Sequence, residues 1–311
     1  MNILVLGGCG YVGTLLVNRL LENKNKVTVI DTQWFGNYLN NIVNLKVKKK
    51  DIRDLKNSDF KNIDVVIHLA NIANDPAVEL NETLSWDVNV LASINICRYA
   101  INNKIKKIIF ASSGSVYGIK KERFVTEDLS LVPISTYNKT KMVAEEIFRR
   151  YQNYFELFII RPATVCGYSP RMRLDLSVNM LTMQALKNKK ITVFGGTQIR
   201  PNIHINDLVE LYIFLIKNKI KPGTYNAGFE NMKIIDIAKM IQNEIKSEIV
   251  ISKSNDPRSY RLDSTKILNL GFIKKFSVKD AILDLKDKFE NNKLQDKEYF
   301  YTVKWMKKNK I

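Results

Sequence analysis

Residues 3–13, with the sequence ILVLGGCGYVG, decide the fold of this chain. The four apolar residues at the start predict a buried strand, and the apolar spacing over Tyr11–Glu22 predicts a helix. A glycine-rich turn joins the two. Its glycines fit G-x-G-x-x-G when counted from Gly8 and G-x-x-G-x-x-G when counted from Gly7, and both patterns end at Gly13.

The glycines of this turn suit a ligand that carries a diphosphate, such as a dinucleotide. Glycine allows a tight turn, a close approach of the backbone to the diphosphate, and close packing of the helix on the strand. The N-terminus of the helix then offers N–H groups and the positive end of its dipole to the phosphates. The cofactor-binding residues expected here are Gly7, Gly10, Tyr11, Val12 and Gly13.

An acidic residue, Asp31, ends the second predicted strand at residues 27–30 and follows Gly13 by 18 positions. A carboxylate at about this spacing accepts hydrogen bonds from the 2′-hydroxyl of the adenosine ribose. It also repels a 2′-phosphate, so the sequence predicts NAD as the cofactor rather than NADP.

Strands and helices alternate over the first half of the chain. Further strands are expected at residues 64–69, 107–111 and 156–161, and helices at 83–102 and 135–151. This order predicts an α/β fold: a doubly wound parallel (Rossmann) sheet with a smaller C-terminal α/β substrate-binding domain. We expect the NAD-binding domain to span residues 1–165. Residues 166–311 are expected to form mainly the substrate-binding domain, with some segments returning to the first.

The composition excludes several classes of protein. Apolar residues make up 45% of the 311 residues, enough for a large core, so a disordered chain is excluded. The three cysteines form no C-x-x-C pair and there are two histidines, so a disulfide scaffold and a zinc or multi-histidine centre are excluded, and no metal is expected. No apolar run reaches the ~18–20 residues that cross a bilayer, so a cytoplasmic protein is expected.

The net charge of +18 comes from 49 Lys and Arg against 31 Asp and Glu. A charge of this size fits a nucleic acid, a membrane surface or an anionic small substrate as partner. The basic, aromatic segment at residues 298–311 fits a partner subunit, a membrane, a nucleic acid or a solvated surface helix. The motifs call instead for two anionic small molecules, so neither nucleic acid nor membrane is expected as a partner.

A tyrosine and a lysine four residues apart, Tyr137 and Lys141, lie on one face of the helix expected at 135–151. A nearby ammonium stabilises a phenolate, so the pair predicts a tyrosine with a lowered pKa. Such a tyrosine takes a proton from a sugar hydroxyl as hydride leaves the same carbon. Residues 111–118, ASSGSVYG, follow a predicted strand and place serine hydroxyls where that hydroxyl would bind.

Together these motifs resemble the extended short-chain dehydrogenase/reductases, and within them the NAD-dependent nucleotide-sugar epimerase/dehydratase family. The motifs that follow the order of this family are the glycine turn, Asp51-Ile52, residues 111–118, Tyr137/Lys141 and Arg161-Pro162. The resemblance covers nearly the whole chain. It implies a Rossmann fold, NAD as cofactor, a nucleotide-diphosphate sugar as substrate, and a homodimer that forms through the helices expected at 83–102 and 135–151.

The same resemblance assigns roles to individual residues. Ser113 matches the catalytic Ser/Thr, Tyr137 matches the acid/base, and Lys141 matches the residue that tunes the tyrosine and binds the nicotinamide ribose. The further cofactor contacts that it implies are Asp51, Ile52, Leu69 and Ala70. The substrate-binding residues that it implies are Ser113, Thr164, Arg171, Asn179, Arg200 and Arg258, with Arg200 and Arg258 on the diphosphate of the sugar nucleotide.

Two departures from the family bear on the reaction. Its sugar dehydratases carry an acid pair after the catalytic hydroxyl, whereas this chain has Gly114 and Ser115 there, so loss of water from C5–C6 is poorly supported. Thr164 stands where many epimerases have Asn. The favoured hypothesis is an NAD-dependent nucleotide-sugar epimerase acting at C4 through transient oxidation to a 4-keto sugar.

Other reactions and functions stay open at this point. A net nucleotide-sugar 4-dehydrogenase or 4-keto reductase uses the same residues. A 4,6-dehydratase is less favoured, because it lacks its acid pair. A non-catalytic dinucleotide- or RNA-binding protein is least favoured, because Ser113, Tyr137 and Lys141 are all present.

Overall fold

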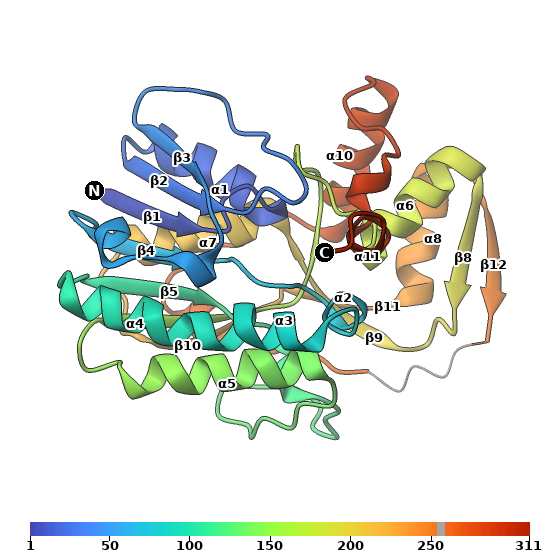
Figure 1. The fold of residues 1–311 in the computed structure, drawn as a ribbon. Coiled ribbons are helices and arrows are strands. Elements are labelled where there is room, and N and C mark those ends of the chain that lie inside the picture. The colour runs from blue at the N-terminus through green and yellow to red at the C-terminus, as the bar shows by residue number, and fades with distance from the viewer. Residues whose placement is uncertain (254–258) are drawn as a thin grey trace.

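The computed structural model describes residues 1–253 and 259–311, and it has helices on both faces of one main sheet (Figure 1). In this described part the main sheet has seven strands, all parallel, in the order β10-β6-β5-β4-β1-β2-β3. The strands are β1 (Asn2–Leu6), β2 (Lys26–Asp31), β3 (Leu45–Lys49), β4 (Val65–His68), β5 (Lys107–Ala111), β6 (Glu156–Pro162) and β10 (Gly223–Ala227). The predicted doubly wound parallel sheet is thereby confirmed.

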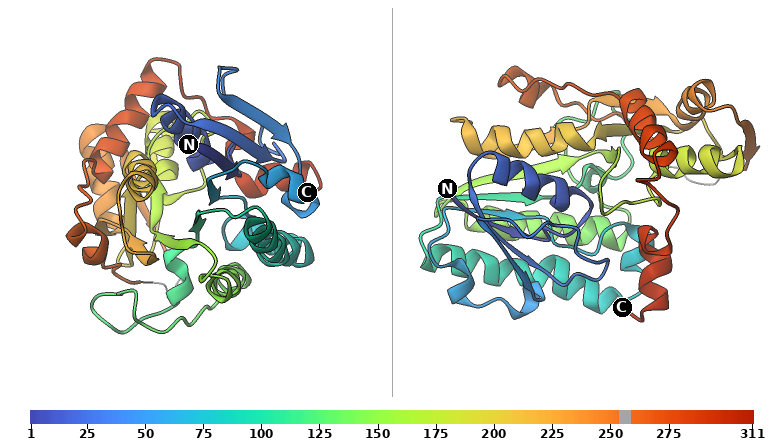
Figure 2. Two further views of the ribbon diagram at one scale, coloured as in Figure 1. Left: turned by 90° about the vertical axis from the view of Figure 1, so that its left-hand side faces the viewer. Right: turned by 90° about the horizontal axis from the view of Figure 1, so that it is seen from above.

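Helices cover both faces of the main sheet. α1 (Tyr11–Glu22) and α7 (Ile205–Lys217) pack together on one face, and α4 (Ala92–Asn102) and α5 (Thr136–Arg150) cover the other (Figure 2). Along β1, Ile3 and Val5 belong to the core under α1, whereas Leu4 and Leu6 belong to the core under α4. A strand that is buried on both faces has a continuous apolar sequence, which is what residues 3–6 show.

The C-terminal part packs beyond the carboxyl ends of the strands (Figure 1). Its strands are β7 (Thr164–Cys166), β9 (Ile199–His204) and β11 (Glu230–Lys233) in one small sheet, and β8 (Lys190–Phe194) and β12 (Glu248–Ser252) in another. Its core lies between α6 (Ser177–Asn188), α8 (Ile234–Glu244) and α10 (Val278–Glu290). α7 and β10 come after residue 166 but lie in the layers of the main sheet, and the domain boundary at 165 stays a prediction.

The helix expected at residues 83–102 is interrupted by a π-helical turn, Asp87–Leu91, between α3 (Glu82–Trp86) and α4. The chain is helical from Glu82 to Asn102, so the predicted helical stretch is present, and the π turn is a local change within it. Within the turn, the Asn89 amide donates to Thr140 Oγ1 at 3.2 Å and exchanges two hydrogen bonds with the backbone of Ile72. A π turn holds one residue more than an α-helical turn and is common at functional sites. Here it turns Asn89 toward α5 and the segment after β4.

A buried ion pair fixes α5 against the main sheet. The Arg161 guanidinium on β6 donates to both carboxylate oxygens of Glu145 on α5, at 2.9 and 2.6 Å, and the two residues are 2% and 0% exposed. Ser112 donates to the same carboxylate, and Arg161 also donates to Tyr117 Oη at 2.7 Å. Burial alone would raise the pKa of Glu145, but the bonds and charge of Arg161 outweigh it and lower the pKa. The carboxylate is therefore charged.

Glu145→Ala is expected to lower the free energy of unfolding by about 3–5 kcal/mol, because the Arg161 charge then stays buried without its partner. Glu146→Ala is the matched control, since the neighbouring carboxylate is 66% exposed and pairs with Arg149 at the surface. Its expected cost is below about 1 kcal/mol. Urea unfolding of the full chain measures both, and equal losses would contradict the role given to the buried pair.

Candidate active site

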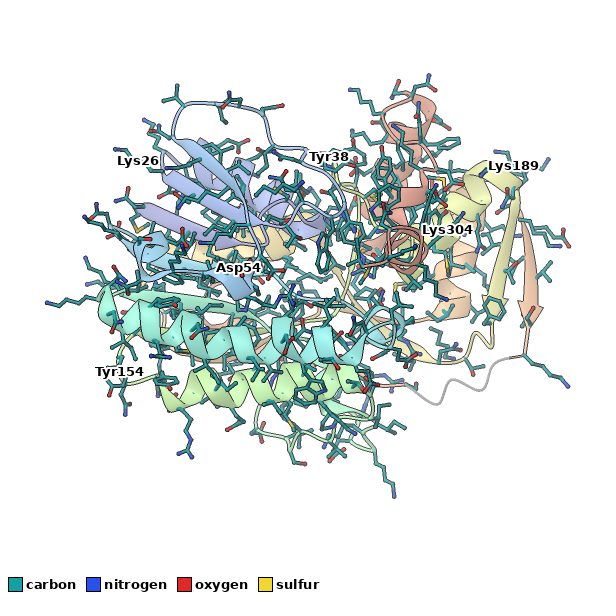
Figure 3. All side chains as sticks on the ribbon, in the orientation of Figure 1. Lys26, Tyr38, Asp54, Tyr154, Lys189 and Lys304 are labelled. Atoms are coloured by element: carbon teal, nitrogen blue, oxygen red, sulfur yellow. The ribbon has the colours of Figure 1, made fainter. Side chains whose placement is uncertain are left out.

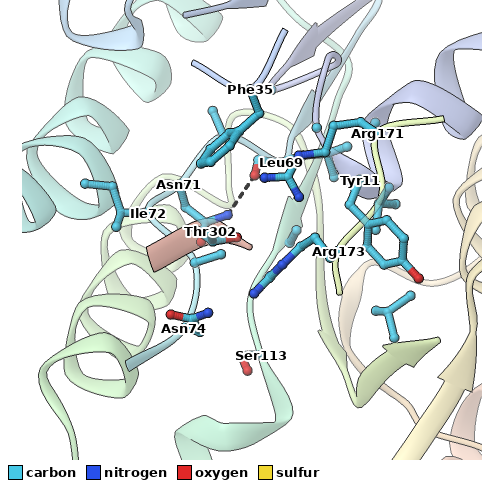
Figure 4. A pocket seen from close by; sticks show the side chains of 18 of the residues that line it. Tyr11, Phe35, Leu69, Asn71, Ile72, Asn74, Ser113, Arg171, Arg173 and Thr302 are labelled. Carbon is cyan, nitrogen blue, oxygen red and sulfur yellow. Dashed lines mark hydrogen bonds between the residues drawn. The ribbon is translucent and has the colours of Figure 1, made fainter. Parts of the chain in front are cut away.

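A cavity of about 410 Å³ opens at the carboxyl ends of the strands (Figure 4). Its walls include the glycine turn, the segments after β2, β4, β5 and β6, and the loop before α6. Open α/β sheets bind ligands at this edge, where the strand order reverses, here beside β1 and β4. The expected site residues that line it are Gly7, Gly10, Tyr11, Val12, Gly13, Asp31, Asp51, Ile52, Leu69, Ala70, Ser113, Tyr137, Thr164 and Arg171.

The glycine turn packs closely on its own backbone and on the next strand. Gly7 has a φ of +87°, and a Cβ on it would stand 2.5 Å from the Ala70 nitrogen. A Cβ on Gly13 would stand 2.4 Å from the Gly7 carbonyl oxygen. On Gly10 the nearest described atom to an added Cβ is 3.4 Å away, and Gly10 lines the cavity. A methyl group at Gly10 would therefore take up space that belongs to a ligand.

Asp31 joins the glycine turn to the loop after β2. Its Oδ2 accepts a hydrogen bond from the Cys9 N–H at 3.0 Å, and its Oδ1 accepts one from the Gln33 N–H at 2.7 Å. Burial raises the pKa of Asp31, and the two N–H donors offset part of that shift. Each carboxylate oxygen has two lone pairs, so Asp31 can still accept from ribose hydroxyls.

One part of the cavity, where the adenine of the cofactor is expected, is formed by residues after β3 and β4. Asp51 accepts from the Arg53 N–H at 2.8 Å and from its guanidinium at 2.9 and 3.1 Å. Ile52 offers an apolar surface, as an adenine ring requires. The backbone of the glycine turn, the Asp31 carboxylate and the apolar surface of Ile52 therefore fit the diphosphate, ribose and adenine of NAD.

Ser113 follows β5, Tyr137 lies in the first turn of α5, and both line the cavity. Ser113 Oγ lies 2.8 Å from Ser115 Oγ, which donates to Asn138 Oδ1 at 2.6 Å. Burial raises the pKa of the Tyr137 phenol to about 12, although a hydrogen bond with Ser113 and the positive charge of Arg173 lower it. The side chains expected to handle a proton therefore line one cavity, and the Tyr137 phenol is protonated at neutral pH.

Lys141 lies one helical turn from Tyr137, but its ammonium is engaged elsewhere. Its Nζ donates to the Ala111 carbonyl at 2.6 Å, and the residue is 2% exposed. Burial lowers the pKa of Lys141 to about 7, and the charge of Glu145 opposes that shift. The cation that lowers the Tyr137 pKa is Arg173. The amine thus turns toward the strand, and the effect of Lys141 on the tyrosine stays a prediction.

Arg173 is a site residue that the sequence analysis left without a role. Its guanidinium donates to both oxygens of Asp175, at 3.0 and 2.9 Å, and the Asn74 amide donates to the same carboxylate at 3.3 Å. In Figure 4 Arg173 lies between Arg171 and Ser113. The sequence does contain a signal for this pair. In the R-x-D spacing of Arg173 and Asp175, a planar guanidinium can pair with a carboxylate on the same loop.

Three expected residues, Asn179, Arg200 and Lys141, are placed differently from the rest. Asn179 is fully buried, its Nδ2 donates to Tyr11 Oη at 3.0 Å, and its Oδ1 accepts from a backbone N–H, so it supports the wall. Arg200 lies on β9. Like Asn179 and Lys141, it is not among the described residues that line the cavity. Arg258 lies outside the described residues.

The positive charge is spread over the surface rather than gathered at the cavity. The exposed Lys26, Lys189 and Lys304 project from β2, from the end of α6 and from α11 (Thr302–Lys308), respectively (Figure 3). Within residues 1–253 and 259–311, no helix is long and apolar enough to span a membrane. The same residues hold no group of three or more His, Cys, Asp or Glu side chains placed to bind a metal ion.

Comparison with known proteins gives the family. A model described as the NAD dependent epimerase/dehydratase family matches residues 3–228. A Methanocaldococcus jannaschii protein with the provisional name UDP-glucose 4-epimerase is 31% identical over 305 residues, 93% of this chain and 99% of that protein. UDP-glucuronic acid decarboxylase 6 of Arabidopsis thaliana is 28% identical over 306 residues, 93% and 89% of the two chains.

A solved structure agrees with these sequence relatives. The UDP-glucuronic acid 4-epimerase of Bacillus cereus, in complex with UDP-glucuronic acid and NAD, superposes with a TM-score of 0.83. It is 27% identical and the match covers 94% of this chain and 100% of that one. Fold, glycine turn and the serine–tyrosine pair thus define an NAD-dependent enzyme with a Rossmann sheet. The chain belongs to the NAD-dependent epimerase/dehydratase family.

Gly10→Ala is expected to weaken NAD binding by about tenfold or more, because the added methyl group occupies ligand space. The free energy of unfolding should change by less than about 1 kcal/mol, since Gly10 has φ −77° and ψ −176°, which alanine adopts. Gly13→Ala is the contrast: its Cβ collides with backbone, so about 1–3 kcal/mol of stability is lost as well. NAD titration and urea unfolding separate the two effects, and similar destabilisation by both variants would contradict the geometry.

Lys141→Met is expected to remove a pH dependence of stability. The folded chain binds the Lys141 proton with a pKa of about 7, against an ordinary value of 10.5, so the unfolded chain binds more protons in between. Wild-type stability should therefore rise by about 2 kcal/mol between about pH 7 and pH 9, at 1.36 kcal/mol per pKa unit. Urea unfolding at the two pH values measures this. If the free energy of unfolding changes equally between pH 7 and pH 9 in the variant and in the wild type, Lys141 does not titrate in that range.

Proposed function

We propose that this chain is a nucleotide-sugar 4-epimerase that inverts C4 of a UDP-sugar through a transient 4-keto sugar. The observation that carries the proposal is that Ser113 and Tyr137 line the same cavity as the glycine turn and Asp31. A hydroxyl proton and the hydride on the same carbon can therefore be handled in one space. The names of the relatives, UDP-glucose 4-epimerase and UDP-glucuronic acid 4-epimerase, support both UDP and C4.

Tyr137 is proposed as the acid/base of the reaction. A bound NAD would supply the acceptor, and later the donor, of the hydride on the sugar carbon. The Tyr137 phenolate, the form that has given up its own proton, takes the proton of the C4 hydroxyl and becomes the phenol. It gives the proton back after the keto sugar has turned over in the pocket. Ser113 hydrogen-bonds with the same hydroxyl, and its own direction is fixed through Ser115 and Asn138. The positive charge that favours the Tyr137 phenolate comes from Arg173, and Lys141 is proposed to hold the nicotinamide ribose.

The sugar nucleotide is proposed to lie on the C-terminal side of the cavity. Thr164 lines that side, beside the start of β7. Arg200 and Arg258 stay proposed contacts of the UDP diphosphate, because a guanidinium fork suits phosphate oxygens. Asn179 is proposed to act indirectly, by holding Tyr11 and the loop that carries Arg173.

The residue at position 115 favours epimerisation over dehydration. Removal of water needs an acid next to the catalytic hydroxyl, and Ser115 donates its hydroxyl hydrogen to Asn138 instead. A net 4-dehydrogenase or 4-keto reductase would use the same residues. Rapid mixing of the holoenzyme with UDP-glucose or UDP-glucuronic acid separates these reactions. Product without net reduced nicotinamide supports the epimerase, and stoichiometric reduced nicotinamide supports the dehydrogenase.

A cytoplasmic homodimer is proposed as well. Its interface would be formed by α4 and α5, which pack side by side on one face of the sheet (Figure 2). Leu91 and Ile94 at the start of this layer are 54% and 36% exposed, as side chains of an interface would be in a single chain.

Tyr137→Phe is expected to lower kcat by about 100-fold or more, because it removes the proton carrier and keeps the ring. The amount of NAD bound per chain should stay unchanged. Tyr154→Phe is the matched control, since Tyr154 is 63% exposed and lies after α5. Epimerisation assays with both UDP-sugars and a measurement of bound NAD test this. Turnover near the wild-type rate in the Tyr137 variant would overturn the proposed mechanism.

A further inference from the structure

Arg171 is a buried cation whose charge the protein does not balance locally. It is 3% exposed and lines the cavity. Its Nη1 donates to the Met172 carbonyl at 3.1 Å, and its Nε is a buried donor with no partner in the described part of the chain. A buried charge without a partner costs several kcal/mol, so this position indicates an anion that the cavity is built to receive.

The other cations on the wall are already paired. Lys50 lies 2.6 Å from an oxygen of Asp59, and Arg173 donates to both oxygens of Asp175. Arg171 forms no ion pair with any described residue. Burial lowers the pKa of Arg171 to about 10, and the carboxylates of Asp175 and Asp31 act on it from a distance. A negatively charged group of a ligand, such as a phosphate, would compensate the cation.

The surroundings of Arg171 belong to the cofactor half of the cavity. The guanidinium carbon lies 4.1 Å from the centroid of the Phe35 ring, in the loop that follows Asp31. Figure 4 shows the guanidinium of Arg171 on the side of Phe35, whereas Arg173 lies on the side of Ser113. Arg171 thus lies beside the loop that follows Asp31, the carboxylate expected to bind the adenosine ribose.

The loop under Arg171 is held from the C-terminal part of the molecule. Trp305 Nε1, on α11, donates to the Trp34 carbonyl at 2.6 Å, and the Tyr299 ring lies 6.4 Å from the Tyr38 ring. Met306 of the same segment lines the cavity. These contacts fix the backbone next to Phe35, so the aromatic face that carries the guanidinium is held in place.

We propose that Arg171 binds the diphosphate of NAD together with the glycine turn, and that it does not serve the sugar nucleotide to which the sequence analysis assigned it. The guanidinium donates to phosphate oxygens, and its flat face stays on Phe35. An organic diphosphate is the shared chemistry of the two ligands, so the test has to distinguish them. The proposal rests on NAD as the cofactor, but on no particular reaction.

The test is a set of binding titrations on the full chain, freed of cofactor by dialysis. Arg171→Gln is expected to weaken NAD and ADP-ribose by roughly 10- to 100-fold, as for a lost charge-assisted hydrogen bond. Binding of adenosine, which lacks the diphosphate, should change by less than about threefold, and so should binding of UDP. Arg150→Gln is the matched control, since Arg150 is exposed at the end of α5.

Three other outcomes would each overturn the proposal. Weaker UDP binding with unchanged ADP-ribose binding would place Arg171 at the sugar nucleotide. Equal weakening of adenosine and ADP-ribose would give the residue a structural role, and no change would mean that it binds neither diphosphate.

If the Arg171→Gln variant does not fold, the same titrations are made with the Arg171→Lys variant. It keeps a positive charge and loses the planar fork, so a smaller loss of about 3- to 10-fold, confined to ADP-ribose and NAD, is expected. No titration involves turnover, so failure of the epimerase proposal would leave these results unchanged.

Discussion

The ion pair between Glu145 and Arg161 is the contact on which the geometry of the active site depends. Two charges in the core are stable only when each has a close partner and further hydrogen bonds. The carboxylate also accepts from Ser112, at the end of β5, and the guanidinium donates to Tyr117, which donates in turn to Asn226 on β10 at 2.8 Å. One polar network thus sets α5, with the tyrosine, against the strand end that carries the serine.

Much of the fold could be predicted from the sequence, because the signals are local. The strand–turn–helix at residues 3–22, the strand that ends at Asp31 and the helix that carries Tyr137 each show a pattern of burial or glycine spacing. The structure has all three, with bounds within about two residues, as terminal turns allow. The π turn at Asp87–Leu91 could not be predicted, because apolar spacing reports which face is buried and not whether one residue is added within the helix.

The details of the site were harder to predict for a different reason. Spacing places Lys141 and Tyr137 on one face of α5, but the direction of a long side chain depends on its acceptor, the Ala111 carbonyl. Likewise, the R-x-D spacing of the loop before α6 allows Arg173 to pair with Asp175, but nothing in that loop shows that Arg171 stays without an ion-pair partner. That difference arises only when the loop lies over Phe35, a residue from a distant part of the chain.

The contact between Trp34 and Trp305 has a consequence for how the protein is made. The two residues are 271 positions apart. Synthesis proceeds from the N-terminus, and domains begin to fold as they emerge. The glycine turn and Asp31 are therefore made long before the segment that fixes the loop beside them, and the seventh strand, β10, also arrives late. Until then the cavity of the nascent chain lacks one wall, so its enclosure is among the last steps of folding.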